Sequence, residues 1–399
     1  MNFERTPLEL ELEVAVQRFV RDTVVPYEQD PRIDSRGPAD ELRRELQQAA
    51  RARGLLAPQL SLKHGGRGLD HRQTATVFRA SGYSLLGPLA MNAMAPDEGN
   101  MYLLEKIARP AQLERYLLPL AAGEVRSCFL MTEPDGGAGS DPSMLNTTAE
   151  RHGDEWIIHG RKWLITGAEG AAFGILMART ESGATMFLVS MQDPNLHLER
   201  RLKTLDNSLP GGHSCIRIEG LRAGPESVLG APHEGFRYAQ VRLAPARLTH
   251  CMRWWGAAQR AHDEATAYAV KRRAFGKPLI DHEGVSFLLA DNAIDLQQTL
   301  LLIDHAAWTL DAGGNGGHES SVAKVACSEA LSRVVDRSLQ VLGGLGVTDD
   351  SPVAKIYREI RGFRIYDGAS EVHRWAIARR LGRQVQERPG VHAPPLTAG

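Results

Sequence analysis

The sequence predicts an α+β protein in which two helical regions flank a middle region of β-strands. Apolar residues recur at helical spacing from residue 8 to about residue 122. Short runs rich in Ile, Val and Trp, separated by turns, follow to about residue 235, and long helical patterns return from Phe236. These observations predict three domains and a disordered tail, at residues 1–123, 124–235, 236–385 and 386–399.

The composition excludes several classes of protein. The 399 residues carry 47 Lys+Arg and 48 Asp+Glu, a formal net charge of −1, so a nucleic-acid partner is not expected. The sequence contains no apolar run of about 18 residues and begins without a secretory leader, so no membrane association is expected. Four widely spaced cysteines without a CxxC pair predict reduced core thiols, a cytoplasmic location and no metal site.

The first helices carry clear start and stop signals. Thr6 and Glu9 form a capping box, with Pro7 at the first helical position. A second helix is predicted from Asp40 to Arg53, where Gly54 ends it.

The middle region has the composition and spacing of β-strands. The turn at Gly153–Asp154 lies between two of the expected segments, as in a hairpin. The even spacing predicts a small antiparallel barrel or sandwich. The expected strands are residues 127–131, 155–158, 162–166, 173–178, 185–190 and 214–218.

The third region is again helical, with much longer segments. A glycine run at residues 313–317 separates two of them, and Ser351–Pro352 predicts the start of a shorter helix. The expected long helices are residues 243–271, 284–310 and 319–342, and a last helix is expected at 370–383.

A glycine-rich segment from Met131 to Asp141 follows the first predicted strand. Such a turn exposes backbone N–H groups and lets a large anion approach the backbone closely. Glycine content alone favours a plain surface loop. The segment lacks the GxGxxG pattern between strand and helix of a dinucleotide-binding fold.

Two further segments suit cofactor contacts. Leu164 and Thr166 are two residues apart on a predicted strand, so they share a face that could pack an aromatic ring and hydrogen-bond to it, although core packing is favoured. Arg272, Arg273 and Lys277 cluster beside Gly276 after a long helix. This cluster suits a phosphate group as well as it suits a charged helix C-terminus.

The last chemical candidate is Asp367, which follows an apolar pair and precedes Gly368. A carboxylate in apolar surroundings has a raised pKa and serves as a general base. For a lone Asp before Gly and Ser, a helix N-cap is the ordinary alternative.

Taken together, these segments resemble the acyl-CoA dehydrogenase family. The resemblance rests on Met131-Thr-Glu-Pro followed by Gly139-Ser-Asp, on Arg272-x-x-Phe-Gly-Lys, on Gln340-x-x-Gly-Gly-x-Gly, and on Tyr366-Asp-Gly. It covers at least residues 124–383.

The resemblance implies a fold and a cofactor. Family members have an N-terminal helical domain, a middle antiparallel β-barrel domain and a C-terminal four-helix bundle, with FAD between the last two and partly held by a neighbouring subunit. By motif position, the residues expected near the flavin ring and pyrophosphate are Met131, Thr132, Ser140, Leu164 and Thr166. Those expected at the ADP part are Arg272, Phe275, Gln340, Gly344 and Glu371, the first four acting on a partner subunit's FAD.

The resemblance also implies a reaction. Asp367 would remove the α-proton of an acyl-CoA while the β-hydride passes to flavin N5, giving a 2-enoyl-CoA. Arg247 and Gly368 fall where the substrate is expected. An electron-transfer flavoprotein is the expected electron acceptor, and a homodimer or homotetramer is the expected assembly.

The chain departs from the common family pattern at the base. Most members have glutamate where Asp367 stands, and the position used by others, on the first bundle helix, is Ala246 here. A branch of the family carries Asp in a similar Asp-Gly-x-x-Glu-Val-His context, and this chain resembles that branch. Leu164 replaces an aromatic residue common over the flavin, with Trp163 one position away on the opposite face of the strand.

Two alternatives remain open at this level. Nitroalkane oxidases share the fold and use an aspartate base, and Asp367 with Arg374 seven residues later fits them equally well. A non-catalytic partner subunit of an acyl-CoA dehydrogenase would keep the fold without turnover.

Overall fold

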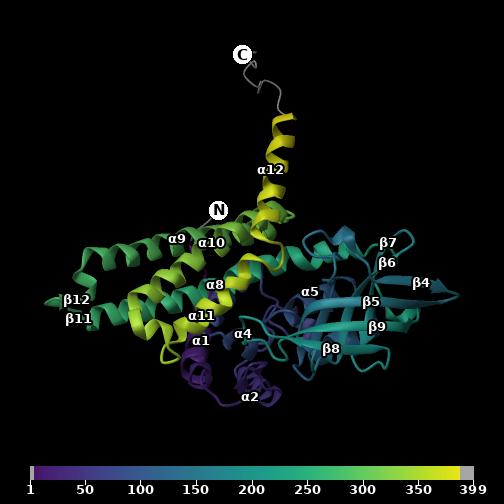
Figure 1. Ribbon diagram of the computed structural model, residues 1–399, viewed down its shortest axis with the longest axis horizontal. Helices are drawn as coiled ribbons and strands as arrows, with labels where there is room; N and C mark the ends of the chain where they lie inside the picture. Colours follow the sequence, from purple (N-terminus) through teal and green to yellow (C-terminus); the bar gives the residue numbers. More distant parts are fainter. Residues whose placement is uncertain (1–3, 387–399) are drawn as a thin grey trace, which may run out of the picture.

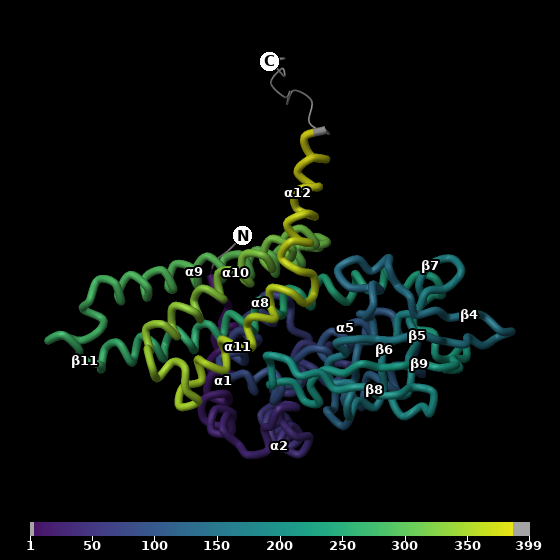
Figure 2. Tube along the Cα trace, viewed as in Figure 1, coloured from purple at the N-terminus to yellow at the C-terminus, as the bar shows by residue number. Residues whose placement is uncertain are grey.

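The computed structural model describes residues 4–386 and has the predicted α–β–α order. The β domain lies at one end of an elongated molecule, and a bundle of long helices extends to the other end (Figure 1). The short N-terminal helices lie along one side of both (Figure 2).

The N-terminal domain begins as its sequence predicts. Thr6 Oγ1 accepts a hydrogen bond from the Glu9 amide at 3.2 Å, and the Glu9 carboxylate accepts one from the Thr6 amide at 2.7 Å. The capping box is therefore confirmed. The main helices of this domain are α1 (Pro7–Phe19), α2 (Asp40–Arg51), α3 (His71–Ser81) and α5 (Asp97–Ile107).

The middle domain is one eight-stranded sheet in which most neighbours run antiparallel. Two pairings differ from the antiparallel prediction, because β3 and β4 each run parallel to β6. The two segments expected at 155–158 and 162–166 are one long strand, β5. The strands are β3 (Ser127–Leu130), β4 (Thr148–His152), β5 (Glu155–Thr166), β6 (Phe173–Thr180), β7 (Gly183–Ser190), β8 (Leu196–Leu202), β9 (His213–Ala223) and β10 (Val228–Leu229).

The sequence did not reveal β4 and β8, and their residues explain why. β8 reads LHLERRL and lies at the sheet edge, with its charged residues exposed. β4 reads TAERH, with a single buried side chain. Backbone pairing with neighbours therefore defines these strands, because neither has the apolar alternation that identifies a strand from sequence.

The C-terminal domain is built on α8 (Gly235–Lys271), whose 37 residues span about 55 Å. It packs against α9 (Glu283–Asp311), α10 (Gly317–Leu342) and α11 (Pro352–Ile360), through a shared apolar core. The short hairpin of β11 (Arg273–Ala274) and β12 (Lys277–Pro278) joins α8 to α9 at the end remote from the β domain (Figure 1).

The last helix, α12 (Ser370–Gln386), projects away from the body of the molecule (Figures 1 and 2). The expected tail lies outside the described residues, apart from residue 386 at the end of this helix. Between residues 4 and 386, no helix is long and apolar enough to cross a membrane. All four cysteines are buried free thiols, as predicted.

Candidate active site

Asp367 lies in the short connection between the turn after α11 and the start of α12. Its backbone has φ 52, in the left-handed region that is uncommon for any residue except glycine. Gly368 follows with φ 96, and a Cβ there would lie 2.5 Å from His373 Nε2, so only glycine fits. Strained backbone of this kind is concentrated at functional sites. Leu164 and Phe275 also have positive φ, at 54 and 47.

Three side chains from different elements hold this strained connection. Arg247 Nε on α8 donates to the Asp367 carbonyl oxygen at 3.1 Å, and His373 Nε2 on α12 lies 3.1 Å from the same oxygen. Lys324 Nζ on α10 donates to the Gly368 carbonyl at 2.6 Å. The position of the carboxylate is therefore fixed through its backbone by the helical bundle.

The Asp367 side chain is fixed separately by His250 of α8. His250 Nε2 lies 3.1 Å from Asp367 Oδ2. Arg253 Nη2 donates to the other ring nitrogen, Nδ1, at 3.1 Å, and the same guanidinium donates to the Ala93 carbonyl at 2.9 Å. Because arginine can only donate, Nδ1 must be the acceptor, and Nε2 carries the hydrogen that it gives to Asp367.

The electrostatics of Asp367 differ from the prediction of a raised pKa. Burial raises the pKa of Asp367, but the hydrogen bond from His250 and the charges of Arg242 and Arg247 outweigh it and hold the pKa below the ordinary value. Burial, together with the charge of Arg253, lowers the pKa of His250, which stays neutral. The sequence-based expectation of an apolar pocket was wrong because three of these partners lie on α8, more than a hundred residues away in the chain.

The β domain reaches this carboxylate from the other side. Arg242 of α8, one of the charges acting on Asp367, lies 4.1 Å from the ring centroid of Phe129 on β3. Phe129 comes two residues before Met131, so Arg242 links Asp367 to the strand that leads into the glycine-rich segment. On the β8–β9 connection, Asp206 acts electrostatically on Tyr366, the neighbour of Asp367.

A buried ion pair shapes the glycine-rich segment. Lys162 Nζ on β5 lies 2.8 Å from Glu133 Oε1, and both side chains are at most 1% exposed. The other oxygen of Glu133 accepts from the Asn146 amide at 2.6 Å, and Oε1 also accepts from the Thr147 amide at 2.9 Å. One carboxylate therefore anchors both ends of the turn at 134–146.

A β-bulge brings the second motif to the first. The pairing of β5 with β9 shifts register between Lys162 and Ile165, both of which are buried. Between them, Trp163 and Leu164 are 36% and 39% exposed, so both leave the sheet, whereas simple alternation had placed them on opposite faces. The Trp163 amide donates to the Thr132 carbonyl at 2.8 Å, which joins the two motifs directly.

This surface fits the ring and pyrophosphate of a flavin cofactor. Added Cβ atoms at Gly136 and Gly139 would meet nothing within 4 Å, so the turn presents open backbone. Met131, Thr132 and Thr166 are partly exposed beside the apolar pair at the bulge, and Ser140 is exposed. A bare glycine turn next to an exposed apolar surface and a hydroxyl suits an anionic group attached to a planar ring.

Four of the five other predicted cofactor residues are remote from Asp367. Arg247 lies on α8 and Arg272 caps its C-terminal end, about 37 Å further along the helix axis. Phe275 at the hairpin tip is 97% exposed. Gln340 and Gly344 are exposed at the far end of α10, about 24 Å along that helix from Lys324, and Glu371 is exposed on α12. Glu371 lies four residues after Asp367 and is the exception. The other four residues are too far away to contact the flavin surface of their own chain.

Arg374, the basis of the nitroalkane-oxidase alternative, does not contact Asp367. Its guanidinium lies 3.5 Å from Glu329 and 3.7 Å from Glu371. The cations that act on Asp367 are instead Arg242 and Arg247.

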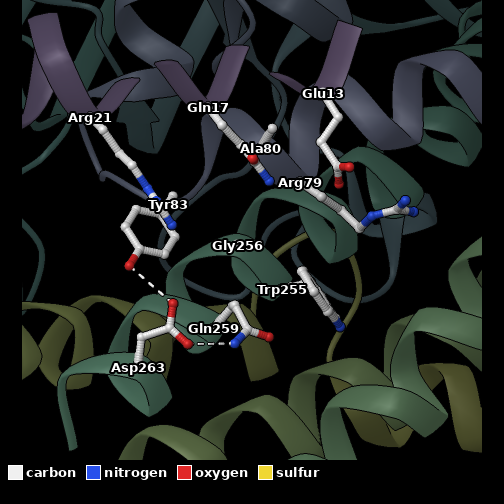
Figure 3. A pocket seen from close by; sticks show the side chains of 10 residues that line it. All are labelled: Glu13, Gln17, Arg21, Arg79, Ala80, Tyr83, Trp255, Gly256, Gln259 and Asp263. Atoms are coloured by element: carbon white, nitrogen blue, oxygen red, sulfur yellow. Dashed lines mark hydrogen bonds between the residues drawn. The ribbon is translucent and has the colours of Figure 1, made fainter. Parts of the chain in front are cut away.

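A cavity of about 260 Å³ lies elsewhere, between α1, α3 and α8 (Figure 3). Tyr83 Oη and Gln259 Nε2 both donate to Asp263 within it, at 3.0 and 2.7 Å, whereas Glu13 and Arg79 pair with Arg5 and Asp304 outside it. Trp255 lines the cavity too, but none of the predicted site residues does. The cavity therefore lies between the two helical regions and apart from the candidate site.

Sequence reasoning missed His250, Arg242, His213 and Asp206 as parts of the site. No local motif marks His250, Arg242 or Asp206, whereas His213 stands in a Gly211-Gly212-His213-Ser214 loop similar to that of the branch with the aspartate base. One sequence signal could have identified some of these residues: an ionisable residue at a helical position that faces the core. Arg242 and Arg253 are such residues, since they are only 5% and 7% exposed.

Comparisons with known proteins point to one family. Models of the acyl-CoA dehydrogenase N-terminal, middle and C-terminal domains match residues 6–124, 128–209 and 233–382. "Probable acyl-CoA dehydrogenase FadE2" of Mycobacterium tuberculosis is 37% identical, over 86% of this chain and 87% of the relative. Human "Acyl-CoA dehydrogenase family member 11" is 32% identical over 94% of this chain, which spans only 50% of that relative.

Solved structures show the same fold. Butyryl-CoA dehydrogenase from Megasphaera elsdenii superposes with a TM-score of 0.86 at 25% identity, over 96% of this chain and 100% of that one. The three matched domains and the Mycobacterium tuberculosis relative together show that the chain belongs to the acyl-CoA dehydrogenase family.

Proposed function

We propose that the chain dehydrogenates an acyl-CoA thioester to a 2-enoyl-CoA, with Asp367 as the base that removes the α-proton. The observation that carries the proposal is the Asp367 carboxylate, which α8, α10 and α12 hold in strained backbone where the β domain meets the bundle. We infer a cytoplasmic location from the four buried free thiols.

The two carboxylate oxygens of Asp367 have different surroundings. Oδ2 takes the hydrogen bond from His250, whereas Oδ1 accepts no hydrogen bond from any described residue. Oδ1 is therefore the oxygen available to a substrate proton. Because the pKa of Asp367 is lowered, the base is ionised in the free enzyme, and the substrate itself must be made more acidic.

The thioester carbonyl supplies that acidity when it receives hydrogen bonds. The backbone N–H of Asp367 and the Arg247 guanidinium lie beside the carboxylate. Loss of one such donor typically costs roughly 10² in rate. When bound, FAD supplies the acceptor for the β-hydride.

Within one chain, Met131, Thr132, Ser140, Leu164 and Thr166 would hold the ring and pyrophosphate end of FAD. Arg272, Phe275, Gln340 and Gly344 would hold the ADP end in a partner subunit, because they lie at the opposite end of the bundle. An electron-transfer flavoprotein is the proposed acceptor of the electrons.

A stripe of exposed apolar side chains supports self-association. Phe287, Ile294, Leu301 and Trp308 repeat every seven residues on α9 and are 65%, 54%, 39% and 37% exposed. A heptad repeat of this kind is typical of a helix that packs against another helix. We propose that a second copy of the chain covers it, in a homodimer or homotetramer.

We expect Arg272→Ala to weaken retention of FAD, because a phosphate contact is lost. Purified protein is dialysed, and FAD per chain is measured from its absorbance. Lys271→Ala is the matched control, since it removes the same charge one residue earlier. Equal FAD occupancy in the two variants would contradict the assignment of Arg272.

We expect His250→Phe to shift the pH dependence of turnover. The pKa of Asp367 is lowered in part by the hydrogen bond from His250, so its loss raises that pKa. The rate of a base falls as pH drops through its pKa, so the acid limb of kcat/KM moves to higher pH in the variant. His262→Phe, on the same helix and away from Asp367, is the control. An acid limb at the wild-type position would show that His250 does not act on the base.

A further inference from the structure

Thr166, His213 and Asp206 form a hydrogen-bonded row at the end of the β5–β9 pair. Thr166 and His213 are directly opposite each other across the strands, and Thr166 Oγ1 lies 3.0 Å from His213 Nδ1. The other ring nitrogen, Nε2, lies 2.8 Å from Asp206 Oδ2. The His213 and Asp206 side chains are 13% and 25% exposed, so the row is largely shielded from water.

The row fixes the direction of each hydrogen bond. A carboxylate can only accept, so Nε2 of His213 carries the hydrogen that it donates to Asp206. Burial is the largest influence and raises the pKa of Asp206, but the interactions with His213 and the hydrogen bonds from Thr204 and the backbone together outweigh it, so the pKa is lowered and the carboxylate is ionised. In the neutral ring Nδ1 is then an acceptor, and the Thr166 hydroxyl must donate to it. The Thr166 hydroxyl oxygen can then only accept a further hydrogen bond, because its hydrogen is already donated to His213.

The surroundings of the row keep this arrangement in place. Asn207 and Ser208, next to Asp206, donate to the Glu359 carboxylate on α11. Arg36 and Glu169 lie beside the Gly211–Gly212 turn that precedes His213. Within the described residues, the side chain that pairs with the Asp206 carboxylate is His213, and no Lys or Arg side chain forms an ion pair with it.

We propose that His213, held by Asp206, makes Thr166 a hydrogen-bond acceptor toward FAD. This inference rests on the proposed function, which places Thr166 beside flavin N5. A hydroxyl that can only accept favours a nitrogen that bears hydrogen, and N5 bears hydrogen only after reduction. The row therefore raises the reduction potential of bound FAD, with His213 and Asp206 as positioning residues.

A Thr166 hydroxyl that is free to donate to N5 would instead favour the oxidised cofactor.

The experiment measures the midpoint potential of FAD in the purified holoenzyme, against a dye of known potential and without substrate. In His213→Phe and in Asp206→Asn, Thr166 regains the freedom to donate. One hydrogen bond is worth about 1 kcal/mol, so the ratio of reduced to oxidised FAD at a fixed potential should fall roughly fivefold. Thr166→Ser should keep the wild-type potential, as should Ser214→Ala, whose buried hydroxyl has no partner among the described residues.

A double variant of Thr166 and His213 distinguishes the proposed effect on the potential from a purely structural role of His213. In a Thr166→Val background, which lacks the hydroxyl, adding His213→Phe should change the potential no further. Wild-type potentials in both His213→Phe and Asp206→Asn would overturn the inference, as would an equal effect of His213→Phe with and without the hydroxyl. A wild-type chain that binds no FAD would instead overturn the proposed function, and the inference with it.

Discussion

Asp367→Asn should reduce the rate at which an accepted acyl-CoA bleaches the flavin by roughly 10²–10⁴, the usual contribution of a general base. Asparagine keeps the shape of the side chain and can still hydrogen-bond to His250, but it cannot take a proton at Oδ1. The measurement is anaerobic stopped-flow reduction of the holoenzyme with a panel of acyl-CoA thioesters of varied length.

Two comparisons make this result specific. Asp336→Asn makes the same chemical change at an exposed position of α10 and should leave the rate unchanged. Dithionite should reduce the flavin of Asp367→Asn as it does that of the wild type, because that reaction needs no base. A rate of acyl-CoA reduction equal to that of the wild type would rule out Asp367 as the base.

The second large effect is expected on stability. Lys162→Met leaves the Glu133 carboxylate buried without its cation, and breaking a buried pair in this way costs roughly 3–5 kcal/mol of the free energy of unfolding. The turn at 134–146 depends on the same carboxylate, so FAD occupancy should fall as well. Urea unfolding followed by circular dichroism measures the first effect, and flavin absorbance the second.

The matched control is Lys203→Met, at an exposed lysine, for which a change within about 0.5 kcal/mol is expected. In the double variant Lys162→Met/Glu133→Gln, neither charge is buried, so part of the stability should return. If Lys162→Met unfolded at the urea concentration of Lys203→Met, the ion pair would have no role in holding the turn.

The sequence predicted the helical domains and most strands because their signals are local. The capping box at Thr6, the proline at position 352 and the apolar runs of β6 and β7 need no knowledge of the rest of the chain. The edge strand β8 could not be predicted, because its pairing with β9 is the reason that its charged residues are extended.

The candidate site divides in the same way. Asp367 and the glycine-rich segment were found because each has a recognisable motif. The partners that set their properties come from distant parts of the chain: His250 on α8 for Asp367, and Lys162 on β5 for Glu133. A hydrogen bond between residues far apart in sequence leaves no periodic pattern, so the electrostatics of the site could be determined only from the three-dimensional structure.

The bulge in β5 has a consequence for how such proteins diverge. Lys162 and Ile165 anchor the strand in the interior, while the two residues between them are looped out and carry none of that packing. Position 164 can therefore exchange leucine for an aromatic ring without disturbing the protein's interior. If position 164 faces the flavin as proposed, natural variation there changes the surface offered to the cofactor at little cost to folding.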